Sequence, residues 1–414
     1  MKKRMMCLCL CLCAMMHALP ALAEDDALHV LNNRWFAVEA YQAQYPDRPV
    51  EVTNPEYDDN GIDTNLETLL RTTDWDVACI DTDDFSLQQL DEAGLLEDIT
   101  GDFGEEAFYP AVRNAVTVSG RMLGVPTQAW CLGTAYTMYW LGEDTYGLSQ
   151  RLGLTAGDEP HNYGELYALA EKYFSLDPEQ RRGTYFLYNA LEGNEASFLL
   201  SGFISQYAAE FADAEGHVDY DTDVFRDGVA QIEALAALLR EHAKPLYEPG
   251  STSLHMLVGD ASNHPLGNTT PFYLGETPNV PMKLEVWVVR AGTDKRDAAL
   301  DLIRASMAEV APHFAPALYE DFDYDALRRA SYDALIAGQI QQGEEQSVID
   351  RLVSLRDAGD DSQYYSSEEI ARYREHVAPY LTFPRCGWVA SWSLATRYLD
   401  GALDLEGLIA ALSE

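Results

Sequence analysis

The sequence has 414 residues, of which 68 are acidic and 28 basic, so its formal net charge at pH 7 is −40. A chain this acidic repels the phosphates of nucleic acids and the headgroups of anionic membranes, which excludes both as default partners. Aromatic residues make up 11% of the sequence, so the chain is not an acidic disordered one, and its length is enough for two globular domains.

The first 23 residues predict a signal peptide. Basic residues at positions 2–4 precede an apolar run over residues 5–19, and Ala21-Leu22-Ala23 offers a small-x-small cleavage site. Because the run is shorter than the ~20 residues of a membrane-spanning helix, we expect cleavage near Ala23 and not an anchor. No leader cysteine follows a small residue at that site. We therefore expect a secreted protein of the cell surface or periplasm, with no lipid anchor.

Three cysteines remain after cleavage of the leader. Cys79 lies in an apolar stretch and is predicted to be a buried thiol. A bridge between Cys131 and Cys386 is open, because connectivity cannot be read from a sequence.

The first elements alternate between strand and helix. They are predicted strands over residues 28–31, 50–52 and 77–80 and predicted helices over residues 35–45 and 66–70. This βαβαβ order predicts a parallel sheet covered by helices on both faces. Ligands of such sheets bind beyond the carboxyl ends of the strands. That rule places a site near residues 32–35 and 81–84.

Helical periodicity dominates the middle of the chain, from residue 141 to about 260. A strand over residues 284–289 follows it, and Thr293-Asp294 caps the next helix. The tail predicts further helices. No long flexible linker divides the chain, so we expect two domains between which the backbone crosses more than once.

Several short motifs follow one another along nearly the whole mature chain. They include Tyr45-Pro46-Asp47-x-x-Val50-x-Val52, Gly94-Leu95-Leu96-Glu97-Asp98-Ile99, Gly120-Arg121-Met122-Leu123-Gly124-Val125-Pro126, and Leu152-Gly153-Leu154 followed by Tyr163-Gly164-Glu165-Leu166. Their shared order resembles that of the extracellular solute-binding proteins of the sugar-binding type, the group that contains maltose-binding protein.

The resemblance implies an α/β, two-lobed periplasmic-binding-protein-like fold of type II. Each lobe would be a mostly parallel sheet flanked by helices, with a hinge of several crossing segments. We expect residues 24–128 and about 268–314 in lobe 1, and about 129–267 with 315–414 in lobe 2.

The resemblance also implies a function. The protein would be a monomeric, non-enzymatic substrate-binding component of an ABC import system. It would close two lobes around a small solute, such as an oligosaccharide or sugar derivative, by hinge bending. Its partners would be the permease subunits of the transporter in the membrane.

Candidate ligand contacts lie at strand ends and near the expected crossings. The predicted residues are Asn33, Trp35, Asp81, Asp83, Trp130, Glu192 and Trp388. An aromatic ring packs against the apolar face of a sugar, while its hydroxyl groups need amide and carboxylate partners. Each tryptophan could instead pack in a core, and Trp388 shares a helix face with Trp392.

Two other functions remain open at this stage. Carboxylates near aromatic rings would also suit a polyamine or another cationic solute. Asp81 and Asp83 could form the carboxylate pair of a secreted glycoside hydrolase, although an acidic loop is expected in so acidic a chain.

Motifs of metal, cofactor and catalytic sites are missing from the sequence. It contains no zinc-protease helix, nucleophile elbow, phosphate loop or dinucleotide fingerprint. A calcium-like spacing from Glu56 to Glu67 has the wrong residue types at two positions. We therefore predict no enzyme, no cofactor and no metal.

Overall fold

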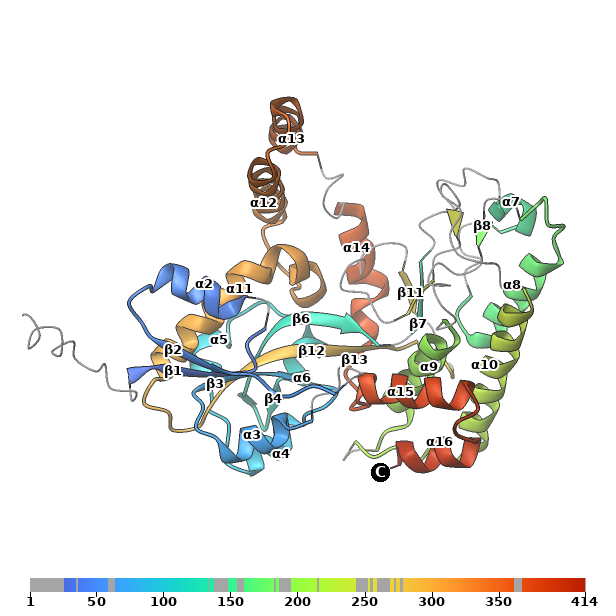
Figure 1. Cartoon of the computed structure of the whole chain (residues 1–414), viewed down its shortest axis with the longest axis horizontal. Helices are drawn as coiled ribbons and strands as arrows, with labels where there is room; N and C mark the ends of the chain where they lie inside the picture. Colours follow the sequence, from blue (N-terminus) through green and yellow to red (C-terminus); the bar gives the residue numbers. More distant parts are fainter. Residues whose placement is uncertain are drawn as a thin grey trace, which may run out of the picture.

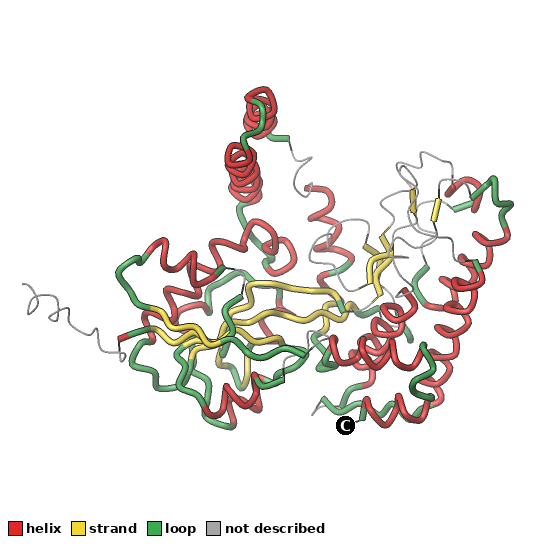
Figure 2. The backbone as a smooth tube through the Cα atoms, in the orientation of Figure 1, coloured by secondary structure: helices red, strands yellow, loops and turns green. Residues whose placement is uncertain are grey.

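The computed structural model describes residues 26–34, 36–58, 64–132, 134–137, 148–154, 160–181, 184–185, 195–213, 216–242, 252–253, 256–258, 269–271, 273–275, 278–360 and 367–413. The predicted signal peptide lies outside these residues. Strands and helices are both present, as the α/β prediction requires (Figures 1 and 2). Among the helices that the structure describes, none has the length and apolarity to cross a membrane.

A mixed sheet forms the centre of one half of the molecule (Figure 1). Its strands are β1 (Leu28–Leu31), β2 (Val50–Thr53), β3 (Val77–Asp81), β6 (Val125–Cys131), β12 (Val280–Val289) and β13 (Leu381–Thr382). Strand β1 pairs in parallel with β2 and β3, which confirms the βαβαβ prediction. Strand β12 pairs antiparallel with β3 and β6. The sheet is mixed because the chain returns along β12 from the other half of the molecule.

Helices cover this sheet from both sides (Figure 1). They are α2 (Ala37–Gln44), α3 (Leu66–Thr72), α4 (Leu87–Glu92), α5 (Thr100–Phe103), α6 (Pro110–Ala115) and α11 (Arg296–Leu318), and a short hairpin of β4 (Thr117–Val118) and β5 (Arg121–Met122) follows α6. Strand β3 is apolar over four consecutive residues, and all four are buried. A strand covered on both faces needs this continuous apolar run.

The other half is mainly helical (Figure 2). It contains α7 (Leu148–Leu152), α8 (Tyr163–Ser175), α9 (Glu195–Phe211), α10 (Asp223–Glu241), α15 (Trp388–Leu399) and α16 (Leu405–Leu412). Side chains cap three of these helices at their first turns: Asn162 caps α8, Thr222 caps α10 and Asp404 caps α16. Each cap satisfies a backbone N–H group that has no partner within the helix.

The described strands outside the main sheet agree only in part with the mostly parallel sheet predicted for a second lobe. Strand β7 (Thr134–Thr137) pairs antiparallel with β10 (Met256–Val258) and β11 (Thr269–Pro271), whereas β8 (Thr184–Tyr185) pairs in parallel with β9 (Thr252–Ser253). Strands β7 and β11 continue the antiparallel pair of β6 and β12. Outgoing and returning segments that lie side by side necessarily run in opposite directions.

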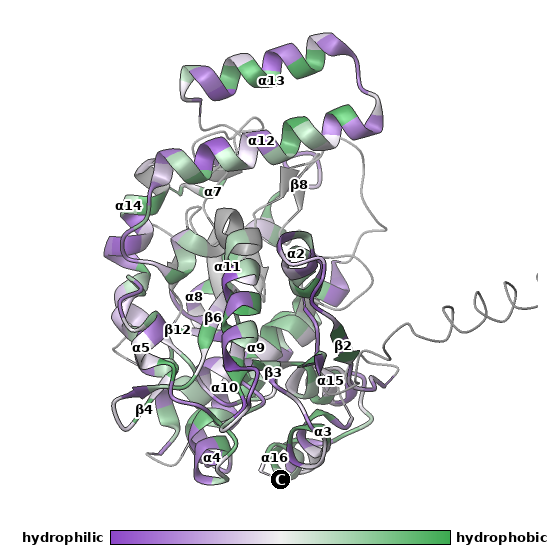
Figure 3. Cartoon of the chain, turned by 90° about the vertical axis from the view of Figure 1, so that its left-hand side faces the viewer, coloured by the Kyte–Doolittle hydropathy of each residue, from purple (hydrophilic) through white to green (hydrophobic). Residues whose placement is uncertain are grey.

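A helical hairpin projects from the body of the molecule (Figures 1 and 3). It consists of α12 (Tyr324–Gln342) and α13 (Gln346–Ala358), after which α14 (Ser367–His376) and a short 3-10 helix (Ala378–Tyr380) lead to β13. Gly343 closes α12 in the left-handed conformation, which a glycine adopts without strain. Helix α13 buries no residue.

Buried apolar side chains form two separate clusters. The first joins the main sheet to its covering helices and extends to α14 and β13. The second joins α8, α9 and α10 to α15 and α16. The chain leaves the first cluster after β6, returns before β12, and leaves again after β13.

We expect the replacement of two helix-interior glycines by alanine to change the stability of the protein in opposite directions. Glycine in a helix costs about 0.5–1 kcal/mol relative to alanine. A methyl group on Gly228 of α10 would collide with the ring of Phe203, whereas one on Gly338 of α12 would meet no atom within 4 Å. We expect Gly228→Ala to destabilise the protein by about 1–3 kcal/mol because overpacking outweighs the gain in helix propensity.

The matched control is Gly338→Ala, which we expect to stabilise the protein by up to about 1 kcal/mol. Guanidinium unfolding midpoints measure both changes. Equal effects of the two substitutions would contradict the packing of α9 against α10.

Candidate functional site

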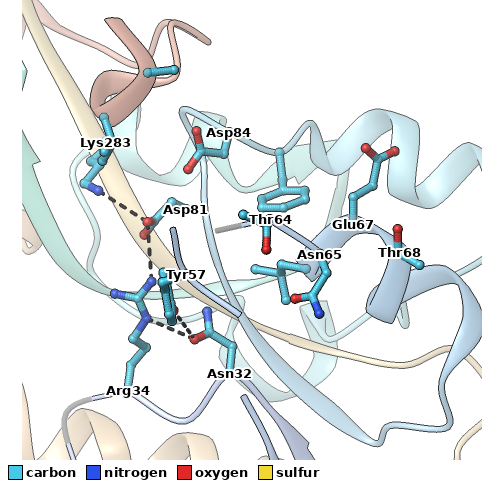
Figure 4. A pocket seen from close by; sticks show the side chains of 14 residues that line it. Asn32, Arg34, Tyr57, Thr64, Asn65, Glu67, Thr68, Asp81, Asp84 and Lys283 are labelled. Carbon is cyan, nitrogen blue, oxygen red and sulfur yellow. Dashed lines mark hydrogen bonds and ion pairs between the residues drawn. The ribbon is translucent and has the colours of Figure 1, made fainter. Parts of the chain in front are cut away.

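A cavity of about 430 Å³ lies where β1 and β3 end (Figure 4). Most of its wall comes from residues at the ends of β1, β2 and β3, from the start of α3 and from β12, and Val389 and Ala390 of α15 complete it. The complete lining is Asn32, Arg34, Tyr57, Thr64, Asn65, Leu66, Glu67, Thr68, Asp81, Asp84, Phe85, Lys283, Val389 and Ala390. The volume lies within the range of small-molecule sites.

Asn32 organises one wall of the cavity (Figure 4). Its backbone has a φ of 59°, a left-handed conformation that asparagine tolerates better than most residues. Its side-chain amide donates to the carbonyl of Cys79 at 2.8 Å. Its Oδ1 accepts from Arg34 Nε at 3.2 Å and from the Tyr57 hydroxyl at 3.3 Å. Asn32 thereby fixes the positions of a cation and an aromatic ring at the cavity.

An ion network crosses the floor of the cavity (Figure 4). Lys283 Nζ lies 3.3 Å from Asp81 Oδ2, and Arg34 lies 3.9 Å from both Asp81 and Glu285. Burial disfavours the charged forms of Lys283 and Arg34, but the neighbouring carboxylates outweigh burial and raise the pKa of each above its ordinary value. Both side chains are therefore cationic at neutral pH.

Acidic groups outnumber basic ones around this network. The carboxylates of Asp81, Asp83 and Asp84 lie within 4.8 Å of one another, and Glu67 lines the same cavity. The two cations offset part of this charge. The arrangement offers hydrogen-bond donors and acceptors side by side, with a net negative potential that disfavours anionic solutes.

The structure brings only some of the predicted site residues together. Asp81 lines the cavity. Asp83 is buried beside it, and its backbone carbonyl accepts from the Gly387 N–H at 3.1 Å. Trp130 is partly buried on β6 opposite Lys283 and is not among the lining residues. Asn33 faces α2, where its Oδ1 accepts from the Val38 N–H at 3.2 Å.

Three predicted residues receive no side-chain description. Trp35 and Glu192 lie outside the described residues, as does the side chain of Trp388, the first residue of α15. Trp392, which was expected to share its face, stacks on Phe198 of α9 at 5.3 Å between ring centroids.

Sequence reasoning missed Arg34, Tyr57 and Lys283 as site residues. The sequence around Arg34 could have identified it as a site residue, because it follows a strand end in the predicted βαβαβ unit. The sequence around Lys283 could not, since this residue is 202 residues from Asp81 in the chain.

None of the three described cysteines forms a disulfide bond. Cys79 is a buried thiol, as predicted. The open possibility of a bridge from Cys131 to Cys386 is not realised. Cys386 Sγ instead lies 3.3 Å from the Ser205 hydroxyl of α9, and burial raises the pKa of its thiol.

The sequence from residue 34 to 253 matches the family of bacterial extracellular solute-binding proteins. No curated protein sequence matches the chain. Among solved structures, the fold is similar to CpMnBP1 with mannobiose bound, at 12% identity and a TM-score of 0.54 over 94% of this chain and 98% of that one. It is also similar to an ABC transporter solute-binding protein from Thermotoga lettingae bound with α-D-tagatose, at 15% identity and a TM-score of 0.50 over 94% and 98% of the two chains.

The matched segment covers more than half of the sequence, and the chain belongs to the bacterial extracellular solute-binding protein family. The family consists of non-enzymatic transport components that act outside the cytoplasm. Family membership confirms the resemblance drawn from the motifs.

We expect the ion pair of Asp81 and Lys283 to contribute to the free energy of unfolding. Both side chains are largely buried, so Asp81→Asn leaves a buried ammonium group with less compensation. We expect a loss of about 2 kcal/mol at pH 7. Because the pKa of Lys283 is raised, its contribution is complete below the ordinary lysine pKa of about 10.4 and is lost as pH rises through the folded-state value.

The control is the double variant Asp81→Asn with Lys283→Met, which removes the uncompensated charge. Chemical unfolding should show that the double variant is more stable than Asp81→Asn alone. Strictly additive losses in this cycle would contradict direct coupling of the two groups.

Proposed function

We propose that the protein is the substrate-binding component of an ABC import system and that it binds an oligosaccharide or sugar derivative in the cavity at the ends of β1 and β3. The observation that carries the proposal is the cavity wall itself, which combines residues at the ends of β1 and β3 with Val389 and Ala390 of α15, a helix that packs in the second cluster through Ala395 and Tyr398. A solute held there contacts both halves of the molecule, so it can stabilise their closed arrangement by its greater affinity for that arrangement.

The two clusters support a two-lobed fold of type II with a hinge of several crossing segments. We propose lobe 1 around the main sheet and lobe 2 around α8, α9 and α10. The predicted boundary assigned residues 315–414 to lobe 2. Because Leu318 of α11, Ile370 and Tyr373 of α14 and Leu381 of β13 belong to the first cluster, we propose that lobe 1 extends to β13 and that only the segment from α15 onward returns to lobe 2.

The cavity has the chemistry that a polyhydroxylated solute requires. Arg34, Lys283 and Asn65 supply hydrogen-bond donors, and Asp81 and Asp84 supply acceptors. The rings of Tyr57 and Phe85 also line it and suit the apolar face of a sugar ring. A neutral ligand agrees with a site whose two cations are already balanced by carboxylates.

The excess of carboxylates supports a second candidate ligand. Asp81, Asp84 and Glu67 outnumber the two cations of the lining, and Tyr57 could contact an ammonium group through its ring. A polyamine or another cationic solute is therefore the alternative within the same function.

The remaining parts of the proposal follow from the family. We propose that the mature protein begins near Glu24, is a monomer outside the cytoplasm, and presents its closed form to the permease subunits of a membrane transporter. All the predicted contacts remain proposed contributors to the same cleft: Asn33, Trp35, Asp81, Asp83, Trp130, Glu192 and Trp388.

Thermal denaturation with a solute panel tests the ligand class. The panel is mannobiose, maltose, maltotriose, tagatose and spermidine, each at 20 and 300 mM salt. We expect a saccharide to raise the Tm, with little dependence on salt and no product formed. A shift by spermidine alone, falling as salt rises, would favour the cationic alternative. Turnover of a saccharide would refute a binding-only function.

Arg34→Met tests the cavity itself. Hydrogen bonds to charged groups contribute about 1.5–3 kcal/mol, so we expect saccharide affinity to fall at least about tenfold. Arg240→Met, an exposed change on α10, serves as the control. Calorimetric titration measures both, and unchanged affinity in Arg34→Met would place the ligand elsewhere.

A further inference from the structure

The main sheet carries a row of polar side chains that continues beyond the described cavity. Glu285 of β12 lies opposite Asp81 on β3 and opposite Gln128 on β6. Residues directly opposite one another on neighbouring strands project from the same face of a sheet. Asp81, Glu285 and Gln128 therefore form one row across three strands.

A second row runs beside the first on the same face. Lys283 lies two residues before Glu285 and opposite Trp130, and its contact with Asp81 shows that it projects toward the cavity. The residues that alternate with these, Leu284 and Val286 on β12 and Ala129 on β6, are buried in the first cluster. One face of this part of the sheet is thus apolar and packed, and the other is polar.

Gln128 is the unusual member of the row. Its side chain is fully buried, yet within the described part of the chain neither its amide nitrogen nor its amide oxygen has a hydrogen-bond partner. Buried amides are almost always paired, because an unpaired polar group loses its hydration without compensation. An unpaired amide at this position suits a hydrogen-bond partner that comes from a bound ligand and not from the protein.

We propose that the Gln128 amide is a ligand contact at the inner end of an extended site, which begins at Tyr57 and follows the polar face of the sheet past Asp81 and Lys283. The inference rests on the proposed function. Neighbouring strands are about 4.8 Å apart, so Gln128 lies two strands, or roughly 10 Å, from Asp81. One sugar ring does not cover that distance, and the site therefore takes a saccharide of at least two rings.

The amide also indicates what it binds. A glutamine side chain offers a donor and an acceptor side by side, which matches adjacent hydroxyl groups of a sugar and carries no charge. Gln128 lies on the last strand before the chain leaves the first cluster. Separation of the lobes exposes this position to an incoming solute, and closure buries it again.

Gln128→Met tests the proposal, because it keeps the length of the side chain and removes the amide. We expect affinity for mannobiose, maltose or maltotriose, whichever the wild type binds, to fall at least tenfold. Without saccharide, the Tm should lie within about 1 °C of the wild type or above it, because replacing an unpaired buried amide is neutral or stabilising. Gln89→Met, the same change at an exposed position of α4, should alter affinity by less than twofold.

A second variant keeps the proposal testable if Gln128→Met does not fold. Gln128→Asn keeps the amide but withdraws it by one methylene, and it should also lose affinity at least fivefold while retaining the fold. Wild-type affinity in either folded variant would overturn the assignment, as would a lower Tm of Gln128→Met with unchanged affinity. Absence of saccharide binding by the wild type would instead refute the proposed function, and the inference with it.

Discussion

The antiparallel pairing of β6 with β12 determines where the polar residues of the candidate site lie. These two strands carry the chain out of the first hydrophobic cluster and back into it. Their register places Gln128, Trp130, Lys283 and Glu285 on one face of the sheet. The same register aligns β12 with β3, and so brings Lys283 to Asp81 across 202 residues of sequence.

Electrostatics then shape the face that this pairing creates. Buried ions are costly unless they are paired, and here Asp81 lies between two cations while Glu285 accompanies Arg34. The pairs leave fixed donors and acceptors at the cavity, and the two cations offset part of the negative charge of the carboxylates. Such a surface is preorganised for a neutral polar solute, because its groups do not need to reorganise when the solute arrives.

The sequence predicted the elements whose signals are local. The apolar run at Val77–Ile80 identified β3, and the strand ends near Asn32 and Asp81 marked the place where the cavity lies. A local signal can also suit more than one role: Asn33 is predicted as a ligand contact because it follows a strand end, but asparagine also serves at helix starts, and its Oδ1 accepts from the N–H of Val38 in α2.

What the sequence could not predict depends on contacts between distant segments. Nothing near Lys283 indicates that Asp81 is its partner, and the antiparallel direction of β12 follows only from the return of the chain. The packing of α14 on the first cluster through Ile370 and Tyr373 was similarly hidden, because the tail of the sequence shows only a series of helices.

We propose that two lobes close over a saccharide held between them, and small-angle X-ray scattering measures such a closure as a change in overall size. We expect the radius of gyration to decrease when a bound saccharide saturates the protein. A saccharide that binds while the radius of gyration stays unchanged would contradict it.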